Sequence, residues 1–177
     1  MGGMKNTKGK EAMVPASPLC ALISRQPFFK GLNQRQFEVL ATVAMEREFK
    51  AGDYILKEGE PANRFYLIME GKVELLTETK NSRIPVQILG AGDDLGWSWL
   101  FPTYYFQRSA QALAPTRTIF FYGTRLRQLC EDDHDLGYEI MKRVAQVAIR
   151  GLNTTMQALD DAHMNNYPAS PAAPKRK

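Results

Sequence analysis

Cysteine and histidine are scarce in this chain, which contains two of each among 177 residues. Cys20 and Cys130 fit no metal-binding or redox spacing. An enzyme of the cupin type would need clustered metal ligands, commonly several histidines, and His134 and His163 are too few to supply them. The chain also has no Ser/His/Asp or Cys/His arrangement near the aromatic loop described below. We therefore expect no metal, no cofactor and no enzymatic activity.

Long apolar runs are also missing. The first fifteen residues are polar and basic, without the apolar stretch of a signal peptide, and no later segment approaches the length of a membrane span. Together with cysteines that suit a reducing compartment, this predicts a cytoplasmic protein without membrane contact.

The formal net charge of +4 belongs to the ends of the chain. Residues 1–11 and 175–177 together carry a net charge of +5, six basic residues less Glu11, which leaves −1 for residues 12–174. Basic ends often serve only solubility, so the charge is weak evidence for nucleic-acid binding. Residues 1–17 and 161–177 are rich in Pro, Ala, Ser and Lys and lack periodicity, and we expect them to be disordered tails around a domain at 18–160.

Short apolar runs separated by turn residues fill the chain from about Phe49 to Tyr122, as in an all-β sandwich or roll. Glycines such as Gly59 and Gly71 are expected to supply the turn geometries between strands. Before this region, Asn33 and Gln36 have the spacing of a capping box, and a helix is expected to follow. The predicted strands are 54–57, 65–69, 72–78, 84–89, 108–114 and 117–122, and the apolar face of the predicted helix is Phe37, Leu40 and Ala44.

Helical periodicity returns after Tyr122. Thr124 is expected to cap a short helix, and a longer helix is expected at about 135–160. Its apolar residues form two stripes, of which the second steps alternately by four and three, as in a coiled-coil seam. We expect a parallel homodimer through that seam, the alternative being one wide stripe buried in the chain's own core. The first stripe is Leu136, Ile140, Val144 and Val147, and the seam is Met141, Ala145, Ala148, Leu152, Thr155 and Leu159.

The segment "GDDLGWSWLFPTYYFQRSA", residues 92–110, joins a glycine turn to an arginine twelve residues after Gly96. Backbone N–H groups after the glycine and the Arg108 guanidinium could together hold an anion. In the alternative, Arg108 only pairs with Asp93 or Asp94. Six of the eighteen aromatic residues lie between Gly96 and Arg108. Three explanations compete: the rings are core that fills the roll, a stacking platform for a planar ligand, or a contact patch for a partner protein. These six are Trp97, Trp99, Phe101, Tyr104, Tyr105 and Phe106.

Three stretches resemble the cyclic-nucleotide-binding domain family: "FFKGLNQRQFEVLA", "FKAGDYILKEGEPANRFYLIMEGKVEL", and "LGAGDDLG" followed by "RSA". The resemblance implies an eight-stranded antiparallel β-roll of the double-stranded jelly-roll type, with N-terminal helices and a long C-terminal helix. It also implies a phosphate-binding cassette and contacts to the purine base. The implied cassette residues are Gly96, Trp97, Ser98, Arg108, Ser109 and Ala110, and the implied base contacts are Thr154 and Thr155.

The cassette departs from the family pattern at Trp97. The resemblance implies a glutamate at this position, whose carboxylate holds the ribose hydroxyl, whereas an indole has one donor and no acceptor. Losing such a charged hydrogen bond costs roughly 1.5–3 kcal/mol. The loop between the glycine and the arginine is also about one or two residues longer than the resemblance implies.

The expected function is a stand-alone sensory module that binds cyclic AMP, cyclic GMP or a related small anion and signals through its C-terminal helix to an unknown protein partner. Fewer than twenty residues follow that helix, so we expect no specific DNA binding by this chain. The alternative is a ligand-free dimeric interaction protein that keeps the roll with an aromatic-filled pocket.

Overall fold

The computed structural model describes residues 17–79, 81–100 and 105–166. It comprises two units, Met1–Leu126 and Arg127–Lys177, which are described separately. Residues 1–16 and 167–177 of the tails expected at 1–17 and 161–177, and the aromatic residues Phe101 and Tyr104, lie outside the described residues.

The chain opens with two helices, α1 (Pro18–Ser24) and α2 (Gln34–Ala41), joined through the 3-10 turn η1 (Pro27–Phe29). The predicted capping box is confirmed: the Asn33 side chain accepts from the Gln36 N–H at 2.9 Å, and the Gln36 side chain accepts from the Asn33 N–H at 3.0 Å. We expected Ala44 to continue this helix, but it does not. It begins a strand and pairs with Phe121, so tertiary pairing overrides the local helical pattern.

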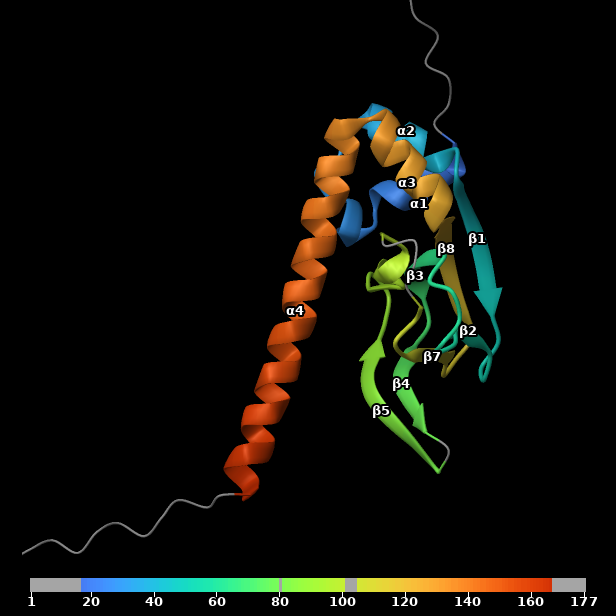
Figure 1. The fold of residues 1–177 in the computed structure, drawn as a ribbon. Coiled ribbons are helices and arrows are strands. Elements are labelled where there is room, and N and C mark those ends of the chain that lie inside the picture. The colour runs from blue at the N-terminus through green and yellow to red at the C-terminus, as the bar shows by residue number, and fades with distance from the viewer. Residues whose placement is uncertain (1–16, 80, 101–104, 167–177) are drawn as a thin grey trace, which may run out of the picture. The chain divides into compact units, whose positions relative to one another are not determined.

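The strands of the described residues form two four-stranded antiparallel sheets, which confirms the predicted eight-stranded roll (Figure 1). The first sheet has the order β1-β8-β3-β6 and the second the order β2-β7-β4-β5. The bounds in the first sheet are β1 (Ala44–Phe49), β8 (Thr116–Tyr122), β3 (Arg64–Glu70) and β6 (Asp94–Leu95). In the second sheet they are β2 (Tyr54–Leu56), β7 (Ser109–Ala112), β4 (Val73–Thr79) and β5 (Ser82–Leu89).

The core lies between the two sheets, and β3 shows how the sequence builds it. Tyr66 and Ile68 belong to the same core cluster as Ala110 and Ala112 of the second sheet. Phe65 points to the opposite face of β3, because successive side chains alternate, and its ring lies 4.8 Å from that of Phe28 beside the N-terminal helices. Both faces of β3 are therefore buried, which explains its continuous apolar run.

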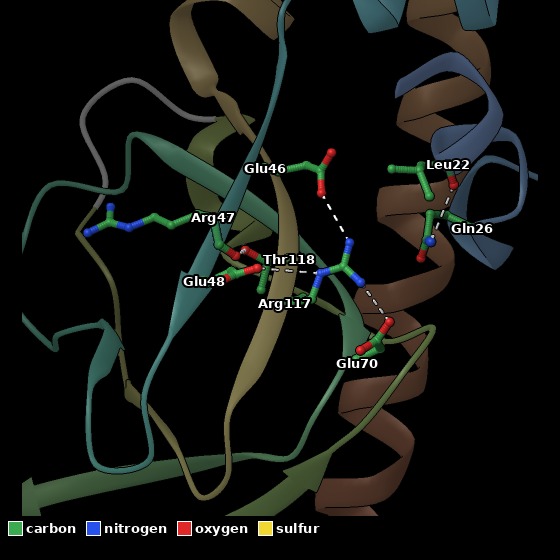
Figure 2. A network of polar contacts seen from close by, with 8 residues as sticks. All are labelled: Leu22, Gln26, Glu46, Arg47, Glu48, Glu70, Arg117 and Thr118. Atoms are coloured by element: carbon green, nitrogen blue, oxygen red, sulfur yellow. Dashed lines mark hydrogen bonds and ion pairs between the residues drawn. The ribbon is translucent and has the colours of Figure 1, made fainter. Parts of the chain in front are cut away.

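A polar network spans three strands of the first sheet (Figure 2). The Arg117 guanidinium lies 2.8 Å from a Glu70 carboxylate oxygen, 3.3 Å from Glu46 and 3.7 Å from Glu48. These residues come from β8, β3 and β1. Exposed ion pairs contribute little stability each, so the network mainly fixes how the three strands align.

The second unit consists of the end of α3 (Gly123–Asp132) and α4 (His134–Asn166). Because α3 starts at Gly123, Thr124 lies inside its first turn and is not the N-cap that we expected. α4 extends six residues beyond position 160, so residues 161–166 are helical where we expected a tail. None of the helices in the described ranges is long and apolar enough to cross a membrane.

Candidate anion-binding cassette

The turn at Gly96 requires glycine. Its φ of +82° lies in the left-handed region, and a Cβ at this position would stand 2.5 Å from the Arg64 carbonyl oxygen and 3.5 Å from a Phe106 ring carbon. Such a contact with backbone cannot be relieved by a rotamer change. Gly96 therefore fixes where the cassette begins, against the first residue of β3.

The two tryptophans after this turn have different environments. Both belong to the short 3-10 turn η2 (Trp97–Leu100), in which Ser98 is half-buried. Trp99 is completely buried, and its ring packs 6.3 Å from that of Phe65, on the face of β3 opposite the core between the sheets. Trp97 is 36% exposed. Neither indole belongs to the core cluster between the sheets, so the described part of the loop does not fill the roll with tryptophan.

The segment around Arg108 is hydrogen-bonded to the turn at residues 58–61. Phe106 donates its N–H to the Glu60 carbonyl at 2.9 Å and accepts from the Gly59 N–H at 2.9 Å. One residue earlier, Tyr105 forms an isolated bridge with Pro61. On the other side, the Ser109 hydroxyl accepts from the Glu58 N–H at 3.1 Å. The chain is thus anchored immediately before and after Arg108.

Arg108 itself is half-buried and makes no hydrogen bond or ion pair with any residue that the structure describes. The alternative in which it pairs with Asp93 is not found among the described residues; one oxygen of the Asp93 carboxylate accepts from the Gly90 N–H at 2.8 Å. The contrast with Arg117, surrounded by three carboxylates in Figure 2, is clear. A partly desolvated guanidinium without a counterion is suited to an anionic ligand.

Ser109 and Ala110 face opposite sides of the second sheet. Ala110 is fully buried in the core between the sheets. The Ser109 hydroxyl donates to a Glu78 carboxylate oxygen at 2.9 Å, and the Tyr54 hydroxyl donates to the other oxygen at 2.6 Å. These two hydrogen bonds, that from Tyr54 first, lower the pKa of Glu78. A ligand that used the Ser109 hydroxyl would therefore have to displace Glu78.

The sequence did not point to Arg64, which the structure brings to the cassette. The Arg64 carbonyl oxygen is the atom that Gly96 approaches. Arg64 as a whole is half-buried, at the start of β3. The available signal was an arginine at the start of the apolar run "RFYLIM", two residues before Tyr66 and therefore on the same face of the strand.

The predicted base contacts Thr154 and Thr155 lie on α4, in the second unit. Their hydroxyls donate to the carbonyls of Arg150 and Gly151, each at 3.0 Å, within the helix itself. Their contact with a purine base stays a prediction.

The predicted seam on α4 is largely exposed. Leu136, Ile140 and Val144 of the first stripe are buried, whereas all the seam positions are exposed except the half-buried Ala148. Two further apolar residues are exposed: Ile149, next to Ala148, and Met156, next to Thr155. The resulting exposed apolar set steps by three, four and three, and consists of Ile149, Leu152, Met156 and Leu159.

Comparisons with known proteins agree with this geometry. Residues 46–133 match the family model of the cyclic nucleotide-binding domain. A solved structure from Geobacter metallireducens GS-15, described as a cyclic nucleotide-binding protein, is similar with a TM-score of 0.67 at 29% identity, over 79% of this chain and 99% of that one. A cyclic nucleotide-binding domain from Methylobacillus flagellatus has the same fold, with a TM-score of 0.69 at 19% identity over 81% and 82% of the two chains.

Two curated relatives extend the comparison. A CRP-like cAMP-activated global transcriptional regulator of Mycobacterium tuberculosis is 25% identical over 83% of this chain and 64% of its own length. A protein of Rhodopseudomonas palustris described as a potassium channel protein is 26% identical over 79% of this chain, which spans 34% of that relative. Residues 46–133, in their two-sheet roll, thus belong to the cyclic nucleotide-binding domain family.

Proposed function

We propose that this protein is a sensory module that binds a small anionic ligand, such as cyclic AMP or cyclic GMP, through Arg108. The observation that carries the proposal is the Arg108 guanidinium, which makes no hydrogen bond or ion pair with the described residues. It lies between two anchored residues, Phe106 and Ser109, in a domain of this family. In this proposal the module works in the cytoplasm, without a cofactor and without catalysis. The bound state is passed through α4 to a protein partner.

The electrostatics of Arg108 favour a phosphate. A guanidinium offers donors in a planar fork that matches two oxygens of one phosphate group, and charge-assisted hydrogen bonds are stronger than neutral ones. Because Arg108 makes no ion pair with the described residues, a ligand need not displace a carboxylate from it. Within the described residues, Arg108 is thus a cation without an ion-pair partner, which supports a role in binding an external anion.

Isothermal titration with cyclic AMP and cyclic GMP tests the proposal. Binding at micromolar concentration that weakens by about tenfold or more in Arg108→Ala is expected, since a hydrogen bond to a charged group contributes roughly 1.5–3 kcal/mol. Arg83→Ala is the matched control, because the Arg83 guanidinium is already bonded to the Glu74 carboxylate. Absence of heat at millimolar nucleotide, or equal binding by Arg108→Ala and the wild type, would contradict the proposal.

We further propose that α4 joins two copies of the chain. Its exposed apolar side chains recur at the spacing of a coiled coil, and a second copy presents the same series. A shift between the paired helices would then report ligand binding.

A ligand-free interaction protein is the second candidate, and exposed aromatic rings favour it. Trp97 is 36% exposed and Tyr105 is 55% exposed, on either side of residues 101–104. Aromatic side chains are enriched in protein interfaces. The same titration separates the candidates, because this protein would bind no nucleotide with or without Arg108.

A further inference from the structure

Arg64 occupies the start of the inward-facing side of β3. Side chains two apart on a strand share a face, so Arg64 lies on the same side as Tyr66 and Ile68. Both of those residues belong to the core cluster between the sheets. Arg64 is therefore a half-buried cation at one end of the inner surface of the roll.

The pairing of β3 with β6 brings the start of β3 to the cassette turn. β3 and β6 pair Tyr66 with Leu95 and Leu67 with Asp94, and β6 ends at Leu95. At the next residue, Gly96, a would-be Cβ stands 2.5 Å from the Arg64 carbonyl oxygen. The backbone of Arg64 therefore lies against Gly96, the residue that precedes Trp97.

The same contact links Arg64 to the Arg108 segment. The would-be Cβ of Gly96 lies 3.5 Å from the ring of Phe106, and Phe106 precedes Arg108 by two residues. Phe106 is in turn hydrogen-bonded to Gly59 and Glu60. The Arg64 backbone and the ring of Phe106, two residues before Arg108, thus both lie against Gly96.

The guanidinium of Arg64 has polar neighbours but no carboxylate bound to it. The Tyr66 hydroxyl is the main group that raises the pKa of Arg64, with smaller contributions from Tyr122 and Glu60. The buried Tyr66 hydroxyl nevertheless meets hydrogen-bond geometry with no residue of the described ranges. No ion pair to Arg64 occurs among those residues either. An anionic ligand at Arg64 would therefore displace no carboxylate of the described residues.

We propose that Arg64 is a second cationic contact of the site around Arg108, and that the ligand carries two separate anionic groups. This inference rests on the function proposed for Arg108. One group would bind Arg108 and the other would bind Arg64 beside Trp97, where an indole offers no acceptor for a hydroxyl group. The chemistry preferred is that of a nucleoside with two phosphates, or with a phosphate and a carboxylate, over that of a singly charged cyclic phosphate.

A pair of probes tests this inference on the full chain. Adenosine 3′,5′-bisphosphate and cyclic AMP share the base and the ribose, but the first has two separate phosphate groups. Isothermal titration should show the bisphosphate binding the wild type at least about tenfold more tightly, the scale of a charge-assisted contact. In Arg64→Gln this preference should disappear, while cyclic AMP affinity stays within about twofold.

Two further variants keep the outcome interpretable. Arg83→Gln removes the same charge from a residue bonded to Glu74 and Gln111, and should retain the bisphosphate preference. Glu60→Gln removes the exposed carboxylate near Arg64 and should strengthen bisphosphate binding, which tests the inference even if Arg64→Gln does not fold. Weaker bisphosphate binding by Glu60→Gln would count against a site at Arg64.

The inference and the proposed function fail in distinguishable ways. Arg108-dependent binding that favours cyclic AMP, or a bisphosphate preference unchanged in a folded Arg64→Gln, overturns the role of Arg64 and leaves the proposed function standing. If neither probe binds the wild type, both are overturned.

Discussion

At the scale of single residues, Trp97 should decide which anion the site prefers. In Trp97→Glu, a carboxylate can accept a hydrogen bond from the ribose hydroxyl of cyclic AMP, and it repels a second phosphate near Arg64. We expect the ratio of the two dissociation constants to shift toward cyclic AMP by about tenfold or more. Competition titrations with both probes measure that ratio. Trp97→Phe keeps an aromatic ring without the carboxylate, so an equal shift in both variants would rule out this explanation.

Gly96 is the residue whose substitution should most affect the stability of the cassette. Gly96→Ala combines an unfavourable φ with a contact of 2.5 Å to backbone, whereas Gly52→Ala, at a φ of +92°, meets nothing within 4 Å. Strained backbone costs about 1–3 kcal/mol, and Gly96→Ala adds a steric clash to that cost. At roughly 2–4 °C per kcal/mol for this size, thermal unfolding should give Gly96→Ala a Tm several degrees below that of Gly52→Ala. Equal Tm values would show that the loop relaxes freely.

At the scale of elements, α2 should depend on its capping box. Asn33→Ala removes the acceptor of the Gln36 N–H at 2.9 Å, and such losses cost about 0.5–2 kcal/mol. Chemical denaturation monitored by circular dichroism should show this loss, while Asn33→Asp, which keeps an acceptor, should retain most of the stability. A full loss in both variants would mean that the amide, and not the cap, is required.

The elements that the sequence predicted are those with strong local signals. The capping box at Asn33 and the apolar run of β3 follow from spacing and side-chain type alone. β1 was missed because "AMEREF" has only its two ends buried, so its strand is set by pairing with β8. β6 has only two residues, too few for any periodic pattern.

The residues of the candidate site likewise fall into those that the sequence predicted and those that it did not. Gly96 and Arg108 could be found from a glycine turn and a charge at a fixed separation. Arg64 could not, because its relation to Trp97 depends on the pairing of β3 with β6. The commitment of the Ser109 hydroxyl to Glu78 was also invisible, since these residues are 31 positions apart. Contacts between distant strands are a tertiary property that local patterns do not contain.

At the scale of the whole molecule, the exposed side of α4 should hold two chains together. Leu152 is 59% exposed and lies within the series that repeats every three and four residues. Burying a leucine contributes about 1.5–3 kcal/mol, and a symmetric dimer buries two copies. Leu152→Asp should therefore weaken the dimer by about a hundredfold or more. Gln157→Asp adds the same charge to α4 outside the series, and it should sediment as the wild type does. Analytical ultracentrifugation at micromolar concentration distinguishes these results: a monomeric wild type, or equal dissociation of both variants, would exclude this face as the dimer contact.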